Sequence, residues 1–398
     1  MIHAKPSGIE PLSVPFARVD CSGNELSYVA EVLQSGWLTT ASKAKRLEEV
    51  FADMIGCTHA IAVNSCTSAL HLALDACGVG PGDKVLLPSL TFTATAEVVR
   101  YMGATPVLLD VVSGTACVEA DAVDAALESD DAIVAVIAVH YGGHPIEMTN
   151  ESGRGLADIC RRRGVRLIND AAHALPSRRD GRCVGADGDV TCFSFYANKT
   201  MTTGEGGMLV TSDDDIAKRA RLMRLHGIDR DVWDRFTGSP GRWEYDVTAP
   251  GFKYNMPDLN AAVGLAQFER LELMRQRRQE CASRYRRELE SVRCMDLPRT
   301  EVADEDHSWH LFPIVLRENA PISRNVLIEK LGELGIGTSV HYKPIHRLRY
   351  YRETYALDAD DYPVTERIWN GCVSLPIYSL LTNVEIDYVI ENVRRLLD

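Results

Sequence analysis

Residues 165–173 read Val-Arg-Leu-Ile-Asn-Asp-Ala-Ala-His, a short apolar run that ends on a carboxylate. The run predicts a strand over residues 165–168. A carboxylate at the end of such a strand is partly buried, and it must be paired or strongly hydrogen-bonded to stay charged. Asp170 is therefore a candidate site residue, and the alternative is an aspartate that caps a helix.

Similar apolar runs precede this one along the chain. They predict strands at residues 59–63, 84–87, 106–109 and 133–139. Segments of helical periodicity lie between them, such as residues 43–55 and 68–74. Apolar strands that alternate with amphipathic helices predict an α/β fold with a mostly parallel sheet covered on both faces. Ligands of such sheets bind at the carboxyl ends of the strands.

The pattern changes after residue 258. A helical periodicity over residues 259–290 predicts one long helix on a charged background. Beyond it we expect strands at 310–316 and 338–341, and helices at 324–334 and 383–397. These elements predict a smaller α+β domain. We place the division at a large domain of residues 1–265 and a small domain of residues 266–398.

The composition excludes several classes of protein. With 43 basic and 56 acidic residues among 398, the net charge of −13 argues against nucleic-acid and acidic-membrane binding. No window approaches the roughly 20 apolar residues of a membrane-spanning helix. The 11 cysteines include no Cys-x-x-Cys pair, and the N-terminus lacks the apolar core of a signal peptide. We therefore expect a cytoplasmic protein with reduced thiols.

Two more strand ends carry polar groups. The turn Asn64-Ser65-Cys66-Thr67 follows the strand at 59–63 and begins a helix, whose free amides at Cys66 and Thr67 suit a phosphate. Plain capping of that helix is the alternative. The second is Lys199, which follows Ser194 and precedes the glycine-rich run 203–207. A lysine held there can lose solvation and become nucleophilic, unless it is an ordinary surface lysine.

These motifs together resemble the sugar-modifying group of fold-type-I aminotransferases that use pyridoxal 5′-phosphate (PLP), the DegT/StrS group. The resemblance rests first on the DAAxA stretch at Asp170 and on the run from Ser194 through Lys199 to Gly207. It extends over nearly the whole chain, with matching segments at 36–40, 88–92, 251–256 and 341–344. The resemblance implies a seven-stranded, mostly parallel sheet and a shared active site in a homodimer.

The resemblance also implies a role for each matched residue. Lys199 would hold the cofactor as a Schiff base and act as the general acid and base, and Asp170 would pair with the pyridine nitrogen. The other cofactor contacts would be Cys66, Thr67 and Ser194 at the phosphate, Phe92 on the ring face, His173 near the ring hydroxyl, and Asn255 from the neighbouring subunit. Substrate contacts are expected at Trp37, Thr39, His341 and Tyr342. For each of these residues, core packing or helix capping is the alternative, above all for His173 and Phe92.

The resemblance implies an enzyme that moves an amino group from L-glutamate to a keto-sugar nucleotide by a ping-pong mechanism. Many relatives carry glycine in place of Cys66 and arginine in place of Asn255, and the run KYNM at 253–256 resembles the subgroup that aminates 4-keto sugars linked to UDP. A UDP- or dTDP-linked 4-keto sugar is the expected substrate. The alternatives are an aminotransferase of a cyclitol or another non-nucleotide ketone, and a regulatory or binding protein on the same fold.

One further pattern resembles a metal site. His140 and His144 have metal-like spacing, but the intervening Tyr141-Gly142-Gly143 cannot form a stable helix face. We therefore expect no metal there. A PLP-dependent sugar dehydratase is excluded as well, because those relatives carry histidine where Lys199 stands.

Overall fold

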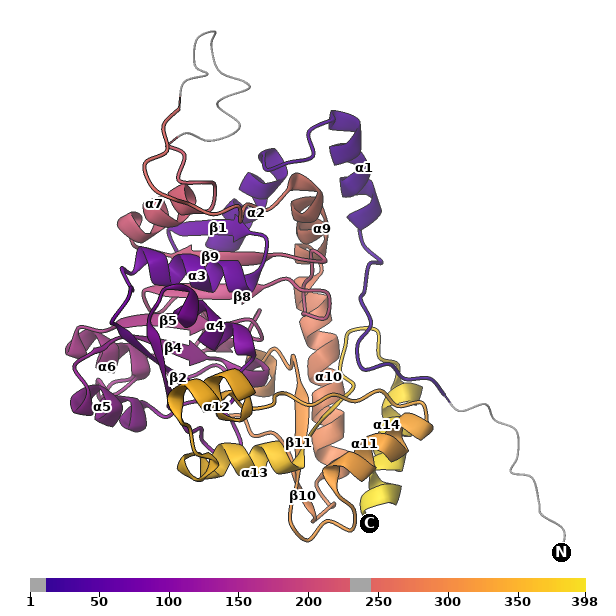
Figure 1. Cartoon of the computed structure of the whole chain (residues 1–398). Coiled ribbons are helices and arrows are strands. Elements are labelled where there is room, and N and C mark those ends of the chain that lie inside the picture. Colours follow the sequence, from indigo (N-terminus) through magenta and orange to yellow (C-terminus); the bar gives the residue numbers. More distant parts are fainter. Residues whose placement is uncertain (1–11, 230–244) are drawn as a thin grey trace, which may run out of the picture.

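The computed structural model describes residues 12–229 and 245–398 of the chain. Its centre is a seven-stranded sheet, which Figure 1 shows edge to edge with helices on either side. Six strands run parallel, and only β9 is antiparallel to its two neighbours. The expected fold class is confirmed. In spatial order the strands are β1 (His59–Val63), β9 (Gly207–Thr211), β8 (Val190–Ser194), β5 (Arg166–Asp170), β4 (Ile133–Val139), β2 (Lys84–Pro88) and β3 (Thr105–Leu109).

Alternate side chains of each strand enter different cores, because successive residues of a strand point to opposite faces. On one face, Ile61, Ile137 and Leu209 pack with helices α3, α4 and α7. On the other face, the adjacent residues of β1 and β9 pack with α2 and α9. The adjacent residues of β4 pack on that face with α5 and α6. These helices are α2 (Ser42–Ile55), α3 (Cys66–Ala76), α4 (Thr93–Tyr101), α5 (Ala120–Ser129), α6 (Leu156–Arg163), α7 (Asp214–Met223) and α9 (Asp258–Phe268).

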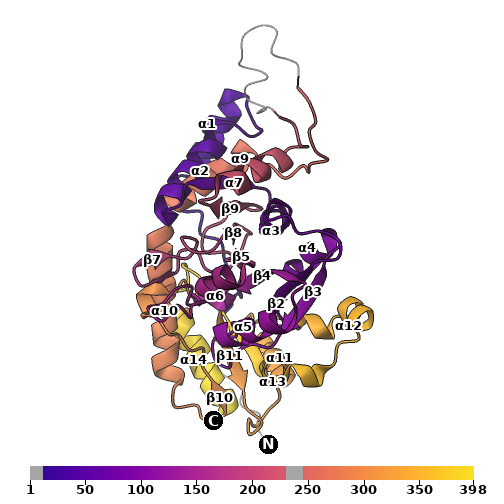
Figure 2. The same cartoon turned by 90° about the vertical axis from the view of Figure 1, so that its left-hand side faces the viewer.

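The C-terminal part builds a second core around a small antiparallel sheet of order β10-β11-β12. Helices α10, α11 and α14 cover this sheet (Figure 2). Val14 belongs to the same core, and its backbone bonds to Gly335 and Gly337. The division at residue 265 stays a prediction. The elements are α10 (Leu271–Leu289), β10 (Met295–Asp296), β11 (Phe312–Leu316), α11 (Arg324–Glu333), α12 (Arg349–Tyr355), α13 (Pro363–Gly371), β12 (Cys372–Leu375) and α14 (Asn383–Leu397).

Two predictions about this part are wrong. The long helix expected over 259–290 is two helices, because Arg270 leaves the helical conformation with φ −113° and ψ 5°. Its guanidinium instead donates to both carboxylate oxygens of Asp20, at 2.9 and 3.1 Å. The strand expected at 338–341 is a single bridge between Ser339 and Ser374.

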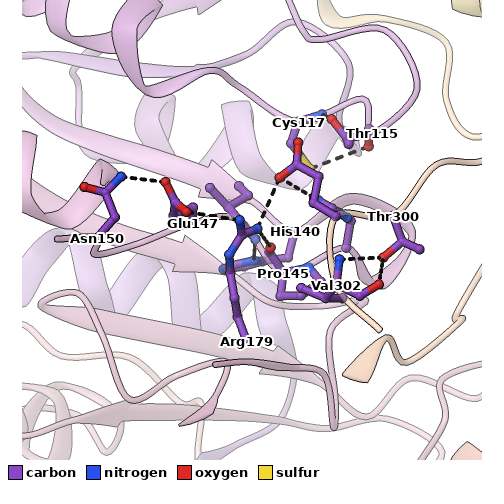
Figure 3. Close-up of polar contacts among 12 residues, drawn as sticks. Thr115, Cys117, His140, Pro145, Glu147, Asn150, Arg179, Thr300 and Val302 are labelled. Carbon is purple, nitrogen blue, oxygen red and sulfur yellow. Dashed lines mark hydrogen bonds and ion pairs between the residues drawn. The ribbon is translucent and has the colours of Figure 1, made fainter. Parts of the chain in front are cut away.

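Arg179 links the segment before β11 to the segment that follows β4 through ion pairs (Figure 3). Arg179 donates to the carbonyl of Pro145 at 3.0 Å and to the carboxylates of Glu147 and Glu301, each at 3.2 Å. Because Glu301 lies just upstream of residues 307–311, this contact helps to fix where that stretch meets the large sheet. Among the described residues, no helix has both the length and the apolar character that crossing a membrane would require.

Candidate active site

The topology brings the ends of β1 and β8 and the start of β9 to one edge of the large sheet. Gly207, the first residue of β9, pairs with Val63 at the end of β1 and with Ser194 at the end of β8. Because β9 runs antiparallel to both, its start lies where they finish. A Cβ on Gly207 would lie 2.7 Å from the Cys66 nitrogen, so only glycine lets the start of α3 approach this closely. Gly207 thereby lies beside both Ser194 and the Cys66 amide.

The N-terminus of α3 has free amide donors. Ser65 caps the helix by accepting from the Ser68 amide at 3.0 Å. Within residues 12–229 and 245–398, the amides of Cys66 and Thr67 have no acceptor. The first amides of a helix point outward along its axis and favour negative charge. These two donors suit a phosphate, with the Thr67 hydroxyl beside them.

Asp170 ends β5 as a buried carboxylate with two donors. Its Oδ1 accepts from the Ala172 amide at 3.1 Å and its Oδ2 from the Thr95 hydroxyl at 2.9 Å. Burial raises the pKa of Asp170, while these two hydrogen bonds and the charge of Lys199 oppose the rise. A carboxylate accepts about four hydrogen bonds, so acceptor capacity remains for a protonated ring nitrogen.

Lys199 lies in the turn after β8 and interacts electrostatically with Asp170 and Cys66. The turn is closed by the bond from the Lys199 amide to the Tyr196 carbonyl, at 3.0 Å. Burial lowers the pKa of Lys199 to about 8, against the opposing effects of Cys66 and Asp170. A larger fraction of the amine is therefore neutral near pH 7 than in an exposed lysine, whose pKa is about 10.4. A neutral amine is the nucleophilic form.

Aromatic and imidazole rings form one wall of the site. The Nδ1 of His173 accepts from the Gly142 amide at 3.2 Å, so its Nε2 carries the proton and donates to the Tyr342 hydroxyl at 2.8 Å. Burial holds the pKa of His173 well below its usual range, and the ring is neutral. Phe92, which is 55% exposed, lies 5.6 Å from Tyr342 between ring centroids. His341 bonds to Ser374 at 2.8 Å.

Three further predicted residues lie around Thr40: Asn255, Trp37 and Thr39. Asn255 donates to the Thr40 hydroxyl at 2.6 Å and pairs through its backbone with Val63. The Trp37 indole lies 3.5 Å from the Thr40 carbonyl, and Thr39 accepts from the backbone of α9. In the part of the chain that the structure describes, Asn255 makes no contact with Lys199 or Asp170 of its own subunit.

Sequence reasoning missed two residues of the site. Thr95 on α4 bonds to Asp170, and the hydroxyl of Thr91, which precedes this helix, lies 2.8 Å from the hydroxyl of Thr95. His310 lies with its Nε2 3.5 Å from the Nζ of Lys199. Nothing in the sequence near either residue indicates these contacts, because Thr95 is 75 positions from Asp170 and His310 is 111 positions from Lys199.

The histidines with metal-like spacing have other partners. The Nδ1 of His140 accepts from the Ile146 amide at 3.2 Å, and the Nε2 of His144 faces Glu301 at 3.7 Å. Figure 3 shows His140 beside the ion pairs of Arg179. Among the described residues, no cluster of three potential ligands could hold a metal ion.

The chain matches known proteins over nearly its full length. The model of the DegT/DnrJ/EryC1/StrS aminotransferase family matches residues 20–394. The spore coat polysaccharide biosynthesis protein SpsC of Bacillus subtilis is 39% identical over 383 residues, which cover 96% of each chain.

Solved structures show the same fold. A putative sugar aminotransferase, Spr1654 of Streptococcus pneumoniae, is 30% identical with a TM-score of 0.87 in its PMP form, over 96% of this chain and 98% of that one. The same protein has been solved in a PLP form. PseC of Helicobacter pylori, an aminotransferase of pseudoaminic acid biosynthesis, is 25% identical with a TM-score of 0.86, over 97% and 99%.

Proposed function

Because the chain belongs to the DegT/DnrJ/EryC1/StrS family of PLP-dependent sugar aminotransferases, we propose that it moves an amino group from L-glutamate to a keto-sugar nucleotide. The observation that carries this proposal is the meeting of three groups at one sheet edge. They are a mostly buried amine at Lys199, a buried carboxylate at Asp170 and the two outward amides of α3. An aminotransferase of this class needs all three to bind its cofactor and use it.

The groups present fit PLP in charge and in hydrogen-bonding capacity. The amides of Cys66 and Thr67, together with Ser194, would hold the phosphate, and Asp170 would keep the ring nitrogen protonated. Phe92 would lie on the ring face and His173 near the ring hydroxyl. When bound, PLP supplies the electron sink that makes a proton on the amino-acid carbon acidic.

The chain itself supplies orientation and proton transfer. In the first half of the ping-pong cycle, the Nζ of Lys199 would take the proton from the α-carbon of glutamate. The nitrogen stays with the cofactor, and water supplies the keto oxygen of the 2-oxoglutarate that leaves. In the second half the same amine returns a proton to the sugar carbon that gains nitrogen. Its pKa of about 8 suits both steps, since a general acid-base group works best near the operating pH.

The substrate in this proposal is a UDP- or dTDP-linked 4-keto sugar. Two observations support it: the KYNM run at 253–256 and the relatives that act in polysaccharide and pseudoaminic acid biosynthesis. His341 and Tyr342 would contact the sugar from the same side as His173, to which Tyr342 is bonded. Trp37 and Thr39 would contact the substrate of the neighbouring subunit's site, together with Asn255.

The proposal includes a cytoplasmic homodimer with shared active sites. Asn255 would complete the phosphate site of the partner subunit, which is consistent with its lack of contact with Lys199 in its own chain. Eleven cysteines without a disulfide among them are consistent with a reducing compartment.

The test is a panel of keto-sugar nucleotides incubated with isotope-labelled glutamate and followed by mass spectrometry. We expect transfer of labelled nitrogen to a 4-keto sugar nucleotide, and no transfer by Lys199→Ala, which also loses the visible absorbance of lysine-bound PLP. Transfer to a free cyclitol ketone alone would contradict the nucleotide assignment. No transfer to any ketone, with PLP bound normally, would contradict the aminotransferase itself.

A further inference from the structure

We propose that His310 is a positioning residue for the active-site lysine, holding the Nζ of Lys199 through its Nε2 in both protonation states of the amine. The proposal deepens the proposed function, since it concerns the same site. His310 lies just before β11, and its Nε2 is 3.5 Å from the Nζ of Lys199. The residue is 5% exposed, so little water competes for the amine on this side.

The backbone around His310 is held firmly. Trp309 has a φ of +47°, a left-handed conformation that is uncommon for a bulky residue and persists only where the surroundings enforce it. The buried guanidinium of Arg278 donates to the carbonyls of Trp309 and His310, each at 3.3 Å, and to that of Ile377 at 2.9 Å. The Trp309 indole donates to the Asp304 carbonyl at 3.0 Å. These contacts fix the direction in which His310 leaves the backbone.

The imidazole is fixed as well. The ring of His173 lies 4.5 Å from that of His310, at an interplanar angle of 34°. His173 is in turn held by the Gly142 amide and the Tyr342 hydroxyl. The ring of His310 therefore has little freedom to leave Lys199.

A purely structural histidine would have both nitrogens satisfied. Among the described residues, the Nδ1 of His310 is buried and has no hydrogen-bond partner. An unsatisfied buried polar atom destabilises a protein, and an apolar side chain of similar shape would avoid that cost. The contact that its Nε2 makes with Lys199 offsets this cost.

A neutral imidazole can serve the amine in either state. Burial, with the charges of Lys199, His173, Arg278 and His341, holds the pKa of His310 well below its usual range. When Lys199 is an ammonium, the Nε2 accepts a hydrogen bond from it. When Lys199 is neutral, the other tautomer donates from Nε2 to the amine lone pair. The remaining groups that face Lys199 are Cys66 and Asp170.

The test measures Lys199 in the cofactor-free protein. Acetic anhydride labels neutral amines, and mass spectrometry of the Lys199 peptide gives the pH midpoint of labelling, expected near 8 in the wild type. His310→Phe keeps water out but removes the acceptor, so the ammonium loses a charge-assisted hydrogen bond. We expect the midpoint to fall by about one pH unit. His310→Gln, which keeps an acceptor, should restore part of the shift.

PLP attachment gives a second readout. Without the hydrogen bond the amine samples more orientations. At about pH 10, where the amine is neutral in both proteins, the rate at which added PLP develops its lysine-bound absorbance should fall about tenfold in His310→Phe. His346→Phe is the matched control, because His346 is also buried but is bonded to Glu366 at 2.7 Å. In this variant the labelling midpoint of Lys199 should equal that of the wild type. Thermal unfolding checks that each variant is folded.

A labelling midpoint that stays at the wild-type value in a folded His310→Phe protein would overturn the proposal and leave His310 as packing. Because labelling needs neither PLP nor a sugar, this result is independent of the substrate assignment. Failure of every keto-sugar nucleotide to accept nitrogen would refute the proposed function and leave the labelling result standing.

Discussion

Asp170 accepts hydrogen bonds from two donors, Thr95 and the Ala172 amide, so the effect of removing one of them should be measurable. The Thr95 hydroxyl is fully buried and donates to Oδ2 at 2.9 Å, and the hydroxyl of Thr91 lies behind it at 2.8 Å. Because burial raises the pKa of Asp170, the group depends on these donors to remain charged. If the pKa of Asp170 rose further, more of the group would be protonated, and it would pair less well with a protonated pyridine ring.

We expect Thr95→Val to weaken PLP binding about tenfold. The variant removes one hydrogen bond to a charged group, worth about 1.5–3 kcal/mol, and the pKa of Asp170 rises further. The dissociation constant can be measured by titrating the cofactor-free protein with PLP and following its absorbance. Thr93→Val on the same helix is the control, because Thr93 bonds to Glu97 at 2.9 Å rather than to Asp170. Equal losses in both variants would point to a helix effect.

Lys199 should destabilise the cofactor-free protein at neutral pH. Its pKa is about 8 in the folded chain and close to 10.4 when unfolded, so the unfolded state binds more protons between these values. Stability therefore rises with pH from 8 to about 10.4, and below pH 8 the full cost is present. We expect Lys199→Met to raise the free energy of unfolding at pH 7 by up to about 3 kcal/mol. Urea unfolding at several pH values would check this, and a gain that is constant with pH would contradict it.

The sequence predicted Lys199, Asp170 and Cys66 because each follows an apolar strand, and strand ends are where parallel sheets bind ligands. It could not predict Thr95 or His310, which reach the site across 75 and 111 positions. Thr95 lies on a helix and His310 in a loop, and neither location has a local pattern that indicates a partner. Their contacts depend on tertiary packing alone.

At the scale of elements, β9 is the strand that assembles the site. It is the one antiparallel strand of the described large sheet, so its first residue, Gly207, meets the ends of both β1 and β8. Gly207 is needed for space rather than for a left-handed backbone, since a Cβ there would lie 2.6 Å from the Ser65 carbonyl carbon. The start of α3 and the strand β9 are packed backbone against backbone.

We expect Gly207→Ala to weaken PLP binding more than it weakens the binding of pyridoxal, which lacks the phosphate. The added methyl group would push the first amides of α3 away from the phosphate position. Comparing the two dissociation constants by absorbance titration isolates this effect. Gly332→Ala in α11 is the control, since a Cβ there meets nothing within 4 Å, and it should stabilise the protein by about 0.5–1 kcal/mol. Equal weakening of both ligands would contradict the expectation.

The boundaries of elements were predictable where a cap or a turn marks them. The helix expected at 383–397 begins and ends there, and its first turn is a capping box of Thr382 and Glu385. The break at Arg270 was not predictable, because the apolar pattern continues through it without a proline or glycine. The residue at the break is paired with Asp20, which lies 250 positions away.

At the scale of the whole molecule, α4 and α12 each expose a tyrosine. Tyr101 is 56% exposed and Tyr350 is 54% exposed. Tyr101 lies 5.5 Å from His71, which packs on Phe252 at 4.5 Å. Exposed apolar area of this kind is typical of protein interfaces. The segment that continues from Phe252 carries Asn255, so this surface supports the proposed dimer.

The shared site can be tested by complementation. We expect Lys199→Ala and Asn255→Ala each to lose most activity as homodimers. In a mixed dimer, if Asn255 serves the partner's site, one site carries both substitutions and the other carries neither. With random association, about half of the dimers are mixed, and each mixed dimer has one intact site out of two. Mixing should therefore restore about a quarter of wild-type activity.

The same experiment separates the two arrangements of Asn255. If Asn255 acted within its own subunit, each site of the mixed dimer would carry one substitution, and mixing would restore nothing. Co-refolding the two variants and measuring labelled-nitrogen transfer gives the result, and light scattering confirms that dimers have formed. The double variant mixed with wild type is the control, because it should give one intact site only when Asn255 acts within its own chain.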